Sequence, residues 1–346
     1  MTRLLNATYL SPYIIAEAGV NHEGDLNTAF EMVRQASING AHAIKFQFYK
    51  ASKIASVYAS AYWDTSEEPS ATQYQLFQKY DSFNIADYER IYKCCQSHKI
   101  DFMCSAFDLE SLAQIDPYVA VHKIASADIT YLDMLRKVSG YGKPVILSTG
   151  ASTDPEIETA IKIFAAGNIS IFLLHCVLSY PTPAQYADLS RIKSLQQAYK
   201  DIRIGYSDHT LPEDMHTCLV AACLGALVIE KHFTLDKDLK GNDHYHSMDP
   251  SDLSKLVRLI ERTRELVLSS GEKAPLELQA RLNARRSAIA SIDIPRNSRL
   301  TSSMVSFKRP GTGIQPGQIN EYFGKMLSRD VMQDEILTPN MFLAEP

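Results

Sequence analysis

Eight short apolar runs recur between residues 13 and 230, and they constrain the fold more than any other feature of the chain. Each run is rich in β-branched or aromatic residues, ends in polar residues, and is followed by a stretch of helical length. The runs cover residues 13–17, 43–48, 101–105, 121–124, 144–148, 171–175, 202–206 and 226–230. Strands that alternate with helices favour a parallel sheet, and eight such units favour an α/β fold closed as a TIM (β/α)8 barrel over a doubly wound sheet.

The polar residues that follow the seventh and eighth runs include His209 and His232. Parallel strands end at the same edge of a sheet, so the two imidazoles can approach each other, and neutral imidazole is a common metal ligand. A histidine after a strand is often only a helix cap or a surface group, and that alternative stays open for each one. Two such residues in consecutive units favour a metal site.

The other runs also lead into polar residues, which a TIM barrel gathers at the C-terminal ends of its strands, where such enzymes carry out their chemistry. These are Glu17, Lys45, Gln47, Ser105, Lys123, Ser126, Ser148, His175 and Tyr180, with Ser207, Asp208 and Lys231 beside the two histidines. A single lysine at a strand end is as often structural as functional. Several charged groups converging on one opening indicate a ligand, because charges are rarely buried without a partner.

Composition narrows the class of protein. The chain has 346 residues and a net charge of −5, which argues against nucleic acid or an anionic membrane as its main partner. Its six cysteines include the adjacent Cys94 and Cys95 but no C-x-x-C pair, so neither a disulfide framework nor a thiolate metal site is expected, and a reducing cytoplasm fits best. The longest apolar run, 218–230, is too short to span a bilayer, and no signal peptide is expected.

The composition changes after the eighth unit. We expect the barrel domain to cover residues 1–270, including a final amphipathic helix over 249–269, and a linker to cover 271–283. Short alternating runs at 287–295 and 303–317, rich in Pro and Gly turns, predict a small loop-rich β module over 284–346. A module of this size is near the limit of independent stability, so we expect it to dock on another surface.

Several segments between about residue 12 and the end of the chain form a recognisable series. They are AEAGVNHEGDLNTAFEM, AIKFQ, CSAFD, HKIASAD, LSTGAS, HCVLSYPTP, GYSDHT, EKHFT, GNDHYHSMDP and FKRPGTGI. In residues and in order, they resemble the sialic acid synthase family, which includes the N-acetylneuraminate, legionaminate and pseudaminate synthases. The resemblance implies a TIM barrel followed by an antifreeze-like, or SAF, domain. It also implies condensation of phosphoenolpyruvate with an open-chain N-acylated amino sugar, releasing phosphate and a nine-carbon 2-keto acid.

The resemblance also implies roles for single residues. It assigns His209 and His232 to a divalent metal, most often Mn²⁺, with Mg²⁺ or Co²⁺ as alternatives, and Glu17 as the catalytic carboxylate. It places Lys45, Lys123, Ser105, Ser126, Ser148, Tyr180 and Ser207 around phosphoenolpyruvate, and Gln47, Asp128 and Asp243 against the sugar. It further implies that Arg309 reaches into the barrel of a partner subunit, and hence a domain-swapped homodimer.

The chain departs from the family pattern at a few positions. Leu178 stands where an Asn is expected, Ser105 replaces a Thr, and Asp128 replaces a Glu that would face the sugar. Asn297 and Asp334 stand at turns where Gly is expected, and both residue types tolerate left-handed geometry. The sequence leaves open whether the acceptor is N-acetylmannosamine, a 2,4-diacetamido-6-deoxy hexose or a sugar phosphate.

Two other functions are consistent with parts of the sequence. A Schiff-base aldolase using Lys45 or Lys123 would require a lysine of lowered pKa and no metal. A non-catalytic carbohydrate- or ice-binding protein would be organised around the C-terminal module, but it would not need paired lysines and histidines at the opening of a barrel.

Overall fold

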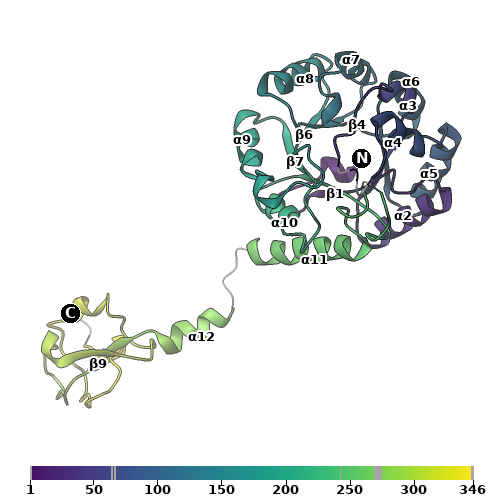
Figure 1. Cartoon of the computed structure of the whole chain (residues 1–346). Coiled ribbons are helices and arrows are strands. Elements are labelled where there is room, and N and C mark those ends of the chain that lie inside the picture. The colour runs from purple at the N-terminus through teal and green to yellow at the C-terminus, as the bar shows by residue number, and fades with distance from the viewer. Residues whose placement is uncertain (1, 64, 66–67, 242, 269–274, 344–346) are drawn as a thin grey trace. The chain divides into compact units, whose positions relative to one another are not determined.

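The computed structural model describes residues 2–63, 65, 68–241, 243–268 and 275–343 of the chain. The chain divides into two compact units, Met1–Leu268 and Ser269–Pro346. In the first unit, eight parallel strands close into a barrel in sequence order, and helices form a ring around them (Figure 1). The predicted TIM barrel is therefore confirmed.

The strands lie close to the predicted runs, with ends that shift by a few residues. They are β1 (Tyr13–Gly19), β2 (Ala43–Phe48), β3 (Asp101–Ala106), β4 (His122–Ile124), β5 (Val145–Ser148), β6 (Ile171–His175), β7 (Arg203–Asp208) and β8 (Val228–His232). The barrel closes where β1 pairs with β8, with Glu17 in register with His232. The last two strands extend beyond the predicted runs, because Ser207, Asp208, Lys231 and His232 continue the pairing.

The helices of the first unit are α1 (Thr2–Leu5), α2 (Leu26–Ile38), α3 (Ala51–Ile54), α4 (Gln73–Tyr80), α5 (Ile85–Ser97), α6 (Leu109–Ile115), α7 (Leu132–Gly140), α8 (Asp154–Ala166), α9 (Ser190–Ala198), α10 (His216–Cys223) and α11 (Pro250–Val267). Side-chain caps explain several of their starts. Asn84 and Asp87 form a capping box before α5, and Thr153 and Glu156 form another before α8, whose first residue is Asp154. Among the described residues, no helix combines the length and the apolarity needed to cross a membrane.

The period-2 alternation of each strand separates two apolar cores. Ile14 and Ala16 of β1 face the helices and join the large core between the strands and the outer ring. Tyr13 and Ile15 face the barrel interior, where they form a smaller core with Leu4 of α1. The apolar filling of the interior thus occupies its N-terminal part, and inward-facing positions nearer the C-terminal ends are free for polar side chains.

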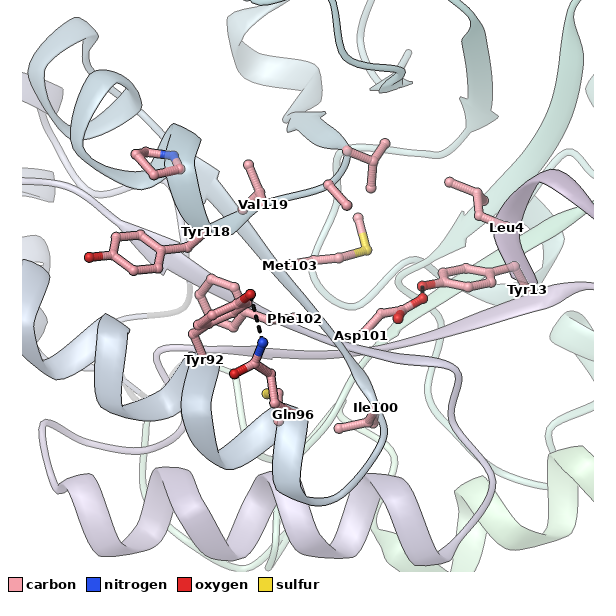
Figure 2. A pocket seen from close by; sticks show the side chains of 14 residues that line it. Leu4, Tyr13, Tyr92, Gln96, Ile100, Asp101, Phe102, Met103, Tyr118 and Val119 are labelled. Carbon is pink, nitrogen blue, oxygen red and sulfur yellow. Dashed lines mark hydrogen bonds between the residues drawn. The ribbon is translucent and has the colours of Figure 1, made fainter. Parts of the chain in front are cut away.

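A cavity of about 310 Å³ opens near the N-terminal ends of β3 and β4. The described residues of the two strands pair through Ser105 and Lys123 alone, so no backbone pairing joins the strands nearer their N-terminal ends. Figure 2 shows the side chains in this gap, with the Tyr13 hydroxyl donating to Asp101 and the Gln96 amide donating to Tyr92. This cavity lies away from the C-terminal ends of the strands, where the candidate site residues cluster.

The second unit combines one helix with a small β module. Helix α12 (Pro275–Ala284) covers most of the predicted linker, because Pro275 at its start and the helix-forming residues after it favour a helix. Strands β9 (Ser287–Ala290) and β10 (Val305–Lys308) pair antiparallel, and isolated bridges hold the remaining turns. Ten buried side chains, including Ile294, Leu300 and Leu327, give this module an apolar core of its own.

Candidate active site

The inward-facing positions at the C-terminal ends of the strands carry the polar side chains that the sequence singled out. Alternation places them on one side of the barrel wall. Glu17, Lys45, Ser105, Lys123, Ser148, Ser207 and His232 all lie there, and all are buried. A TIM barrel uses this end of its strands for catalysis, so the structure brings the predicted residues together at the expected place.

Two buried lysines and two buried carboxylates form the centre of this cluster. Nζ of Lys45 lies 2.7 Å from Oε2 of Glu17 and 3.7 Å from Oε1 of Glu230. Nζ of Lys123 lies 3.4 Å from the same Glu230 oxygen. Lys45 also donates to the Ser105 hydroxyl at 3.3 Å. The carboxylates therefore balance two cations that burial alone would make costly.

The two lysines respond differently to this environment. Burial is the largest influence on Lys45 and lowers its pKa, but Glu17 and Glu230 outweigh it, so the pKa rises above its ordinary value. For Lys123, burial outweighs the attraction of Glu230, and the pKa falls below its ordinary value. Burial raises the pKa of Glu230, but Lys123 and Lys45 outweigh it and hold the carboxyl ionised.

Glu230 was not predicted as a site residue. It is the last residue of the eighth apolar run, so it was not counted among the polar residues that follow the strands. Alternation along β8 places Glu230 on the same face as His232 and turns Lys231 away. That period-2 signal was present in the sequence and identifies Glu230, which also accepts from the Ser207 hydroxyl at 3.3 Å.

His209 and His232 lie side by side, with ring centroids 5.6 Å apart. Nδ1 of His209 is 2.6 Å from the carbonyl oxygen of Val177, which makes it the donor nitrogen and leaves Nε2 with a lone pair. Nδ1 of His232 lies 3.2 Å from Oδ2 of Asp243. The ring of Tyr180 packs on His209, with centroids 4.3 Å apart. Burial lowers the pKa of His209 to about 3, so this imidazole is neutral.

This donor set fits a metal ion. Each imidazole has one nitrogen next to an oxygen of the protein, the usual arrangement for a histidine that binds a metal through its other nitrogen. Among the described residues, no group of three or more His, Cys, Asp or Glu side chains is arranged around one metal position. A metal held by the two imidazoles would thus keep open positions for substrate, as catalytic sites require.

Asp243 approaches the cluster from the segment after β8. A Cβ atom on Gly19, whose φ is +53°, would lie 3.4 to 3.6 Å from atoms of Gln47, Asp243 and Glu17. These three side chains therefore converge around the backbone of Gly19, whose left-handed φ would strain any residue with a side chain. Gln47 donates to Glu17 at 2.9 Å, so its amide orients the carboxylate on the side opposite Lys45.

A cavity of about 370 Å³ lies beside the charged cluster. Predicted residues Gln47, Ser126, Asp128, Tyr180, His232 and Asp243 line it, as does Leu178. One carboxylate oxygen of Asp128, Oδ2, is buried with no hydrogen-bond partner among the described residues. Burial raises the pKa of Asp128 to about 6 despite the opposing charge of Lys123. An unpartnered acceptor inside a cavity indicates a place for a donor on a ligand.

Much of this cavity's wall comes from the segment between β2 and α5, for which no role was predicted. Its aromatic side chains are Tyr49, Tyr62, Trp63, Phe77 and Tyr80. Phe77 and Tyr80 lie at helical spacing in α4, but Tyr49, Tyr62 and Trp63 lie outside it, so no periodic pattern could have brought all five to one cavity. The density of aromatic residues between 49 and 80 was the only available signal.

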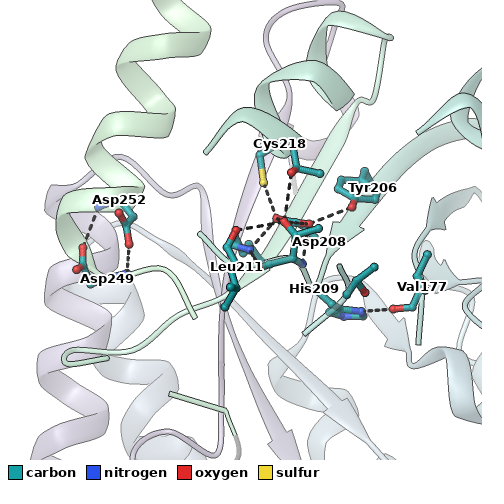
Figure 3. A network of polar contacts seen from close by, with 12 residues as sticks. Val177, Tyr206, Asp208, His209, Leu211, Cys218, Asp249 and Asp252 are labelled. Atoms are coloured by element: carbon teal, nitrogen blue, oxygen red, sulfur yellow. Dashed lines mark hydrogen bonds and ion pairs between the residues drawn. The ribbon is translucent and has the colours of Figure 1, made fainter. Parts of the chain in front are cut away.

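Three of the residues noted beside the strand ends lie on the other side of the barrel wall. His175 contacts the carbonyl oxygen of Ala187 at 2.8 Å and therefore belongs to the outer layer. Asp208 and Lys231 pair with each other at 2.7 Å, and Figure 3 shows Asp208 with Tyr206 and Cys218 around it. Alternation is the reason, because odd and even positions of a strand face opposite sides.

The remaining predicted residues differ in burial and in backbone geometry. Ser148 is buried and its hydroxyl has no partner among the described residues. Arg309 is exposed, just after β10 in the second unit. Asn297 and Asp334 have φ of 64° and 72°, the left-handed geometry expected at those turns.

Comparison with known proteins identifies the family of the chain. Residues 32–273 match the NeuB family, and residues 285–343 match the SAF domain. The chain is 37% identical over 329 residues to N,N'-diacetyllegionaminic acid synthase of Legionella pneumophila, covering 92% of this chain and 91% of that protein. It is 35% identical over 331 residues to the enzyme of the same name from Campylobacter jejuni, covering 94% and 98%.

A solved structure shows the same relationship. The N-acetylneuraminic acid (sialic acid) synthetase of Leptospira borgpetersenii, crystallised with citrate, superposes with a TM-score of 0.68 at 36% identity, covering 78% of this chain and 90% of that one. The resemblance drawn from the sequence motifs is thereby confirmed. The chain is an enzyme that belongs to the NeuB family of sialic acid-type synthases, with a SAF domain following its barrel.

Proposed function

We propose that this enzyme condenses phosphoenolpyruvate with an uncharged, open-chain N-acylated amino sugar, releasing phosphate and a nine-carbon 2-keto acid. The observation that carries the proposal is the buried pair Lys45 and Lys123 beside the two histidines, at the C-terminal end of the barrel. In a chain of net charge −5, these lysines offer a local positive site for a small polyanion.

Phosphoenolpyruvate binding is assigned to the lysines and the hydroxyl groups around them. Ammonium groups attract the carboxylate and phosphate, and serine hydroxyls donate to their oxygens. Ser105 already contacts Lys45, and Ser207 contacts Glu230. Ser126 and Ser148 extend the set of donors. Leu178 offers no side-chain hydrogen bond at the position where the family pattern expects Asn, so the backbone and the serines carry that part of the site.

His209 and His232 would hold a divalent metal, with Mn²⁺ the first choice and Mg²⁺ or Co²⁺ the alternatives. A metal bound there supplies Lewis-acid polarisation of the sugar aldehyde, which makes its carbon open to attack by the weakly nucleophilic enol carbon. Tyr180, packed on His209, shields the pair from water. Replacing either histidine by Ala should abolish turnover and Mn²⁺ binding, and full activity in excess chelator would refute this part of the proposal.

We assign Glu17 to phosphoenolpyruvate, the second reactant. As the carbon–carbon bond forms, positive charge develops at the carbon that bears the phosphate ester oxygen. A carboxylate held by Lys45 and Gln47 can stabilise that charge or orient the water that attacks it. Loss of phosphate from the resulting tetrahedral carbon then leaves the 2-keto acid.

The cavity beside these groups favours an uncharged acceptor. No Lys or Arg lines it among the described residues, whereas Asp128 and Asp243 do. A sugar phosphate would bring a dianion next to two carboxyl groups. The aromatic wall instead suits methyl groups, which a 2,4-diacetamido-6-deoxy hexose carries on its acyl groups and at its end. We therefore place that sugar first, with N-acetylmannosamine second.

The decisive experiment incubates the enzyme with phosphoenolpyruvate, Mn²⁺ and each of three acceptors: the 2,4-diacetamido-6-deoxy hexose, N-acetylmannosamine and its 6-phosphate. Phosphate release and product mass score the reaction. The deoxy sugar should give the highest kcat/KM and the phosphorylated sugar the lowest. A preference for the phosphorylated sugar would overturn the acceptor assignment, and no phosphate release with any acceptor would overturn the function.

A Schiff-base aldolase is the second candidate, because the pKa of Lys123 lies below its ordinary value, as an imine-forming lysine requires. Borohydride reduction in the presence of pyruvate separates the two functions. The synthase mechanism forms no covalent adduct, so the intact mass should stay unchanged. A mass increase located at Lys123 would support the aldolase.

We also propose that the enzyme works as a domain-swapped homodimer in the cytoplasm, where its six free cysteines would stay reduced. In this arrangement Arg309 of one subunit reaches the sugar in the partner's barrel. Mixed dimers of Arg309→Ala and Glu17→Ala chains should regain activity, because one of their two sites holds both intact residues. If subunits exchange and no activity returns, the swapped arrangement is wrong.

A further inference from the structure

His246 is a buried imidazole that the proposed reaction does not yet use. Its side chain has no exposed surface, and neither ring nitrogen has a hydrogen-bond partner among the described residues. A buried polar group without a partner is costly, so such a group calls for an explanation. Its ring lies 5.2 Å from the ring of His232 and 5.7 Å from that of Tyr180, measured between centroids.

Asp243 lies between the two imidazoles. Oδ2 of its carboxylate is 3.2 Å from Nδ1 of His232, and Oδ1 is 3.4 Å from Nε2 of His246. Each oxygen therefore approaches a different ring, and both contacts have the distance but not the angles of a formed hydrogen bond. The carboxylate is mostly buried, so its orientation depends on these neighbours more than on water.

The geometry points to a positioning role for His246. We propose that Nε2–H of His246 fixes the carboxylate of Asp243, which in turn accepts from Nδ1–H of His232 and directs Nε2 of His232 toward the metal. Carboxylates that orient metal-binding histidines in this way commonly change metal affinity by about 10- to 100-fold when removed. This inference rests on the proposed metal pair of His209 and His232.

A competing explanation is that His246 only fills space between Tyr180 and Tyr245. The two explanations predict different metal binding for a variant whose aromatic ring contains no nitrogen. His246→Phe keeps an aromatic ring of similar size and removes the N–H donor. His246→Gln loses the ring but keeps an N–H that can reach Asp243. Positioning predicts that Gln preserves metal binding better than Phe, whereas filling of space predicts the reverse.

The test measures Mn²⁺ affinity directly, by electron paramagnetic resonance of free Mn²⁺ during titration of the full-length protein, without any turnover. His246→Phe should raise the Kd for Mn²⁺ by about 10-fold, in line with loss of an outer-shell partner. His246→Gln should raise it by less than about threefold. In an Asp243→Asn background, His246→Phe should add little further loss, because both changes break the same chain of contacts.

His22 provides the matched control. It is also buried, its Nε2 also lacks a hydrogen-bond partner among the described residues, and its ring stacks on Phe83 with centroids 4.3 Å apart. The rings near it are those of Phe46 and Phe83, whereas the rings near His246 include those of His232 and Tyr180. His22→Phe should lower the melting temperature as much as His246→Phe does, yet leave the Kd for Mn²⁺ within about twofold of wild type.

The possible outcomes distinguish a failure of the positioning role of His246 from a failure of the proposed metal pair. If the wild-type protein binds no Mn²⁺ through His209 and His232, both the metal pair and the role of His246 are wrong. If wild type binds and His246→Phe binds equally well, only the positioning role is wrong. Should His246→Phe fail to fold, His246→Met replaces it, since Met adapts to irregular space and also lacks a donor. Equal affinity for Met and wild type would then refute the role.

Discussion

The carboxylate of Asp208 lies 2.7 Å from the ammonium group of Lys231, with both side chains fully buried on the outer side of the barrel wall. The two residues are in register on β7 and β8, and each directly precedes one of the two histidines of the proposed metal pair. Asp208 also accepts from the hydroxyl of Tyr206 (Figure 3) and from that of Thr210, and Lys231 donates to the carbonyl oxygen of Thr210. This ion pair therefore fixes the backbone from which both imidazoles project.

Removing one partner of this ion pair should be costly. Asp208→Asn leaves Lys231 charged and uncompensated in the interior, so we expect the free energy of unfolding to fall by about 3 to 5 kcal/mol. Urea unfolding followed by circular dichroism measures the change. Asp214→Asn serves as the control, because Asp214 pairs with Lys255 at the surface and its loss should have no measurable effect. Equal stability of Asp208→Asn and wild type would contradict the expected role of the pair.

Glu230 should behave as a counter-ion that a bound anion can replace. In Glu230→Gln the two lysines lose their shared carboxylate, so the ligand-free protein should melt several degrees lower than wild type. Inorganic phosphate should then raise the melting temperature of the variant more than that of wild type. Differential scanning fluorimetry with and without phosphate tests this, with Glu110→Gln as a surface control. An equal shift in both proteins would count against the assignment.

Replacing either lysine should weaken the binding of phosphoenolpyruvate and leave the binding of the sugar nearly unchanged. A hydrogen bond to a charged group contributes about 1.5 to 3 kcal/mol, which corresponds to roughly 10- to 100-fold in binding. Lys45→Met and Lys123→Met should raise the KM for phosphoenolpyruvate by that factor and change the KM for the sugar by less than about threefold. Steady-state phosphate release with one substrate varied at a time gives both constants. Equal effects on both substrates would exclude a selective role.

Asp128 should make stability depend on pH in a defined window. Its pKa is raised to about 6 in the folded chain, chiefly by burial, against about 3.9 for an unfolded chain. Between these values the folded state binds more protons, so its stability falls as the pH rises from about 4 to 6 and the loss persists above that. Asp128→Asn should therefore match wild type near pH 4 and exceed it by on the order of 2 to 3 kcal/mol at pH 7, at about 1.4 kcal/mol per unit of pKa shift.

Urea unfolding at both pH values measures this difference. A gap between Asp128→Asn and wild type that stays constant from pH 4 to pH 7 would show that Asp128 is not the titrating group.

Local patterns predicted the strands well, because a buried parallel strand such as 171–175 consists almost entirely of consecutive apolar residues. They also placed His209 and His232 at neighbouring strand ends, since chain order equals strand order in this barrel. The role of Glu230 could not be predicted in the same way. It depends on Lys45, Lys123 and Glu230 meeting across the barrel interior, and that distance is set by the closure of the sheet, not by any single segment.

The aromatic cavity wall escaped prediction for a different reason. Tyr49, Tyr62 and Tyr80 are spaced without a regular period, and only the path of the chain over the barrel brings them together. Helix α12 was missed because Pro275 suggests a break as readily as a helix start, and the surrounding charges looked like linker.

The register of Glu17 with His232 places the first and last strands of the barrel next to each other. A growing chain exposes an unpaired edge of β1 until β8 has been synthesised, and contacts between such distant segments form slowly because a long loop must close first. The ion pair of Lys45 with Glu17 needs only β1 and β2, whereas Glu230 and His232 arrive with the last strand. During synthesis, the proposed anion site therefore stays incomplete until β8 closes the barrel.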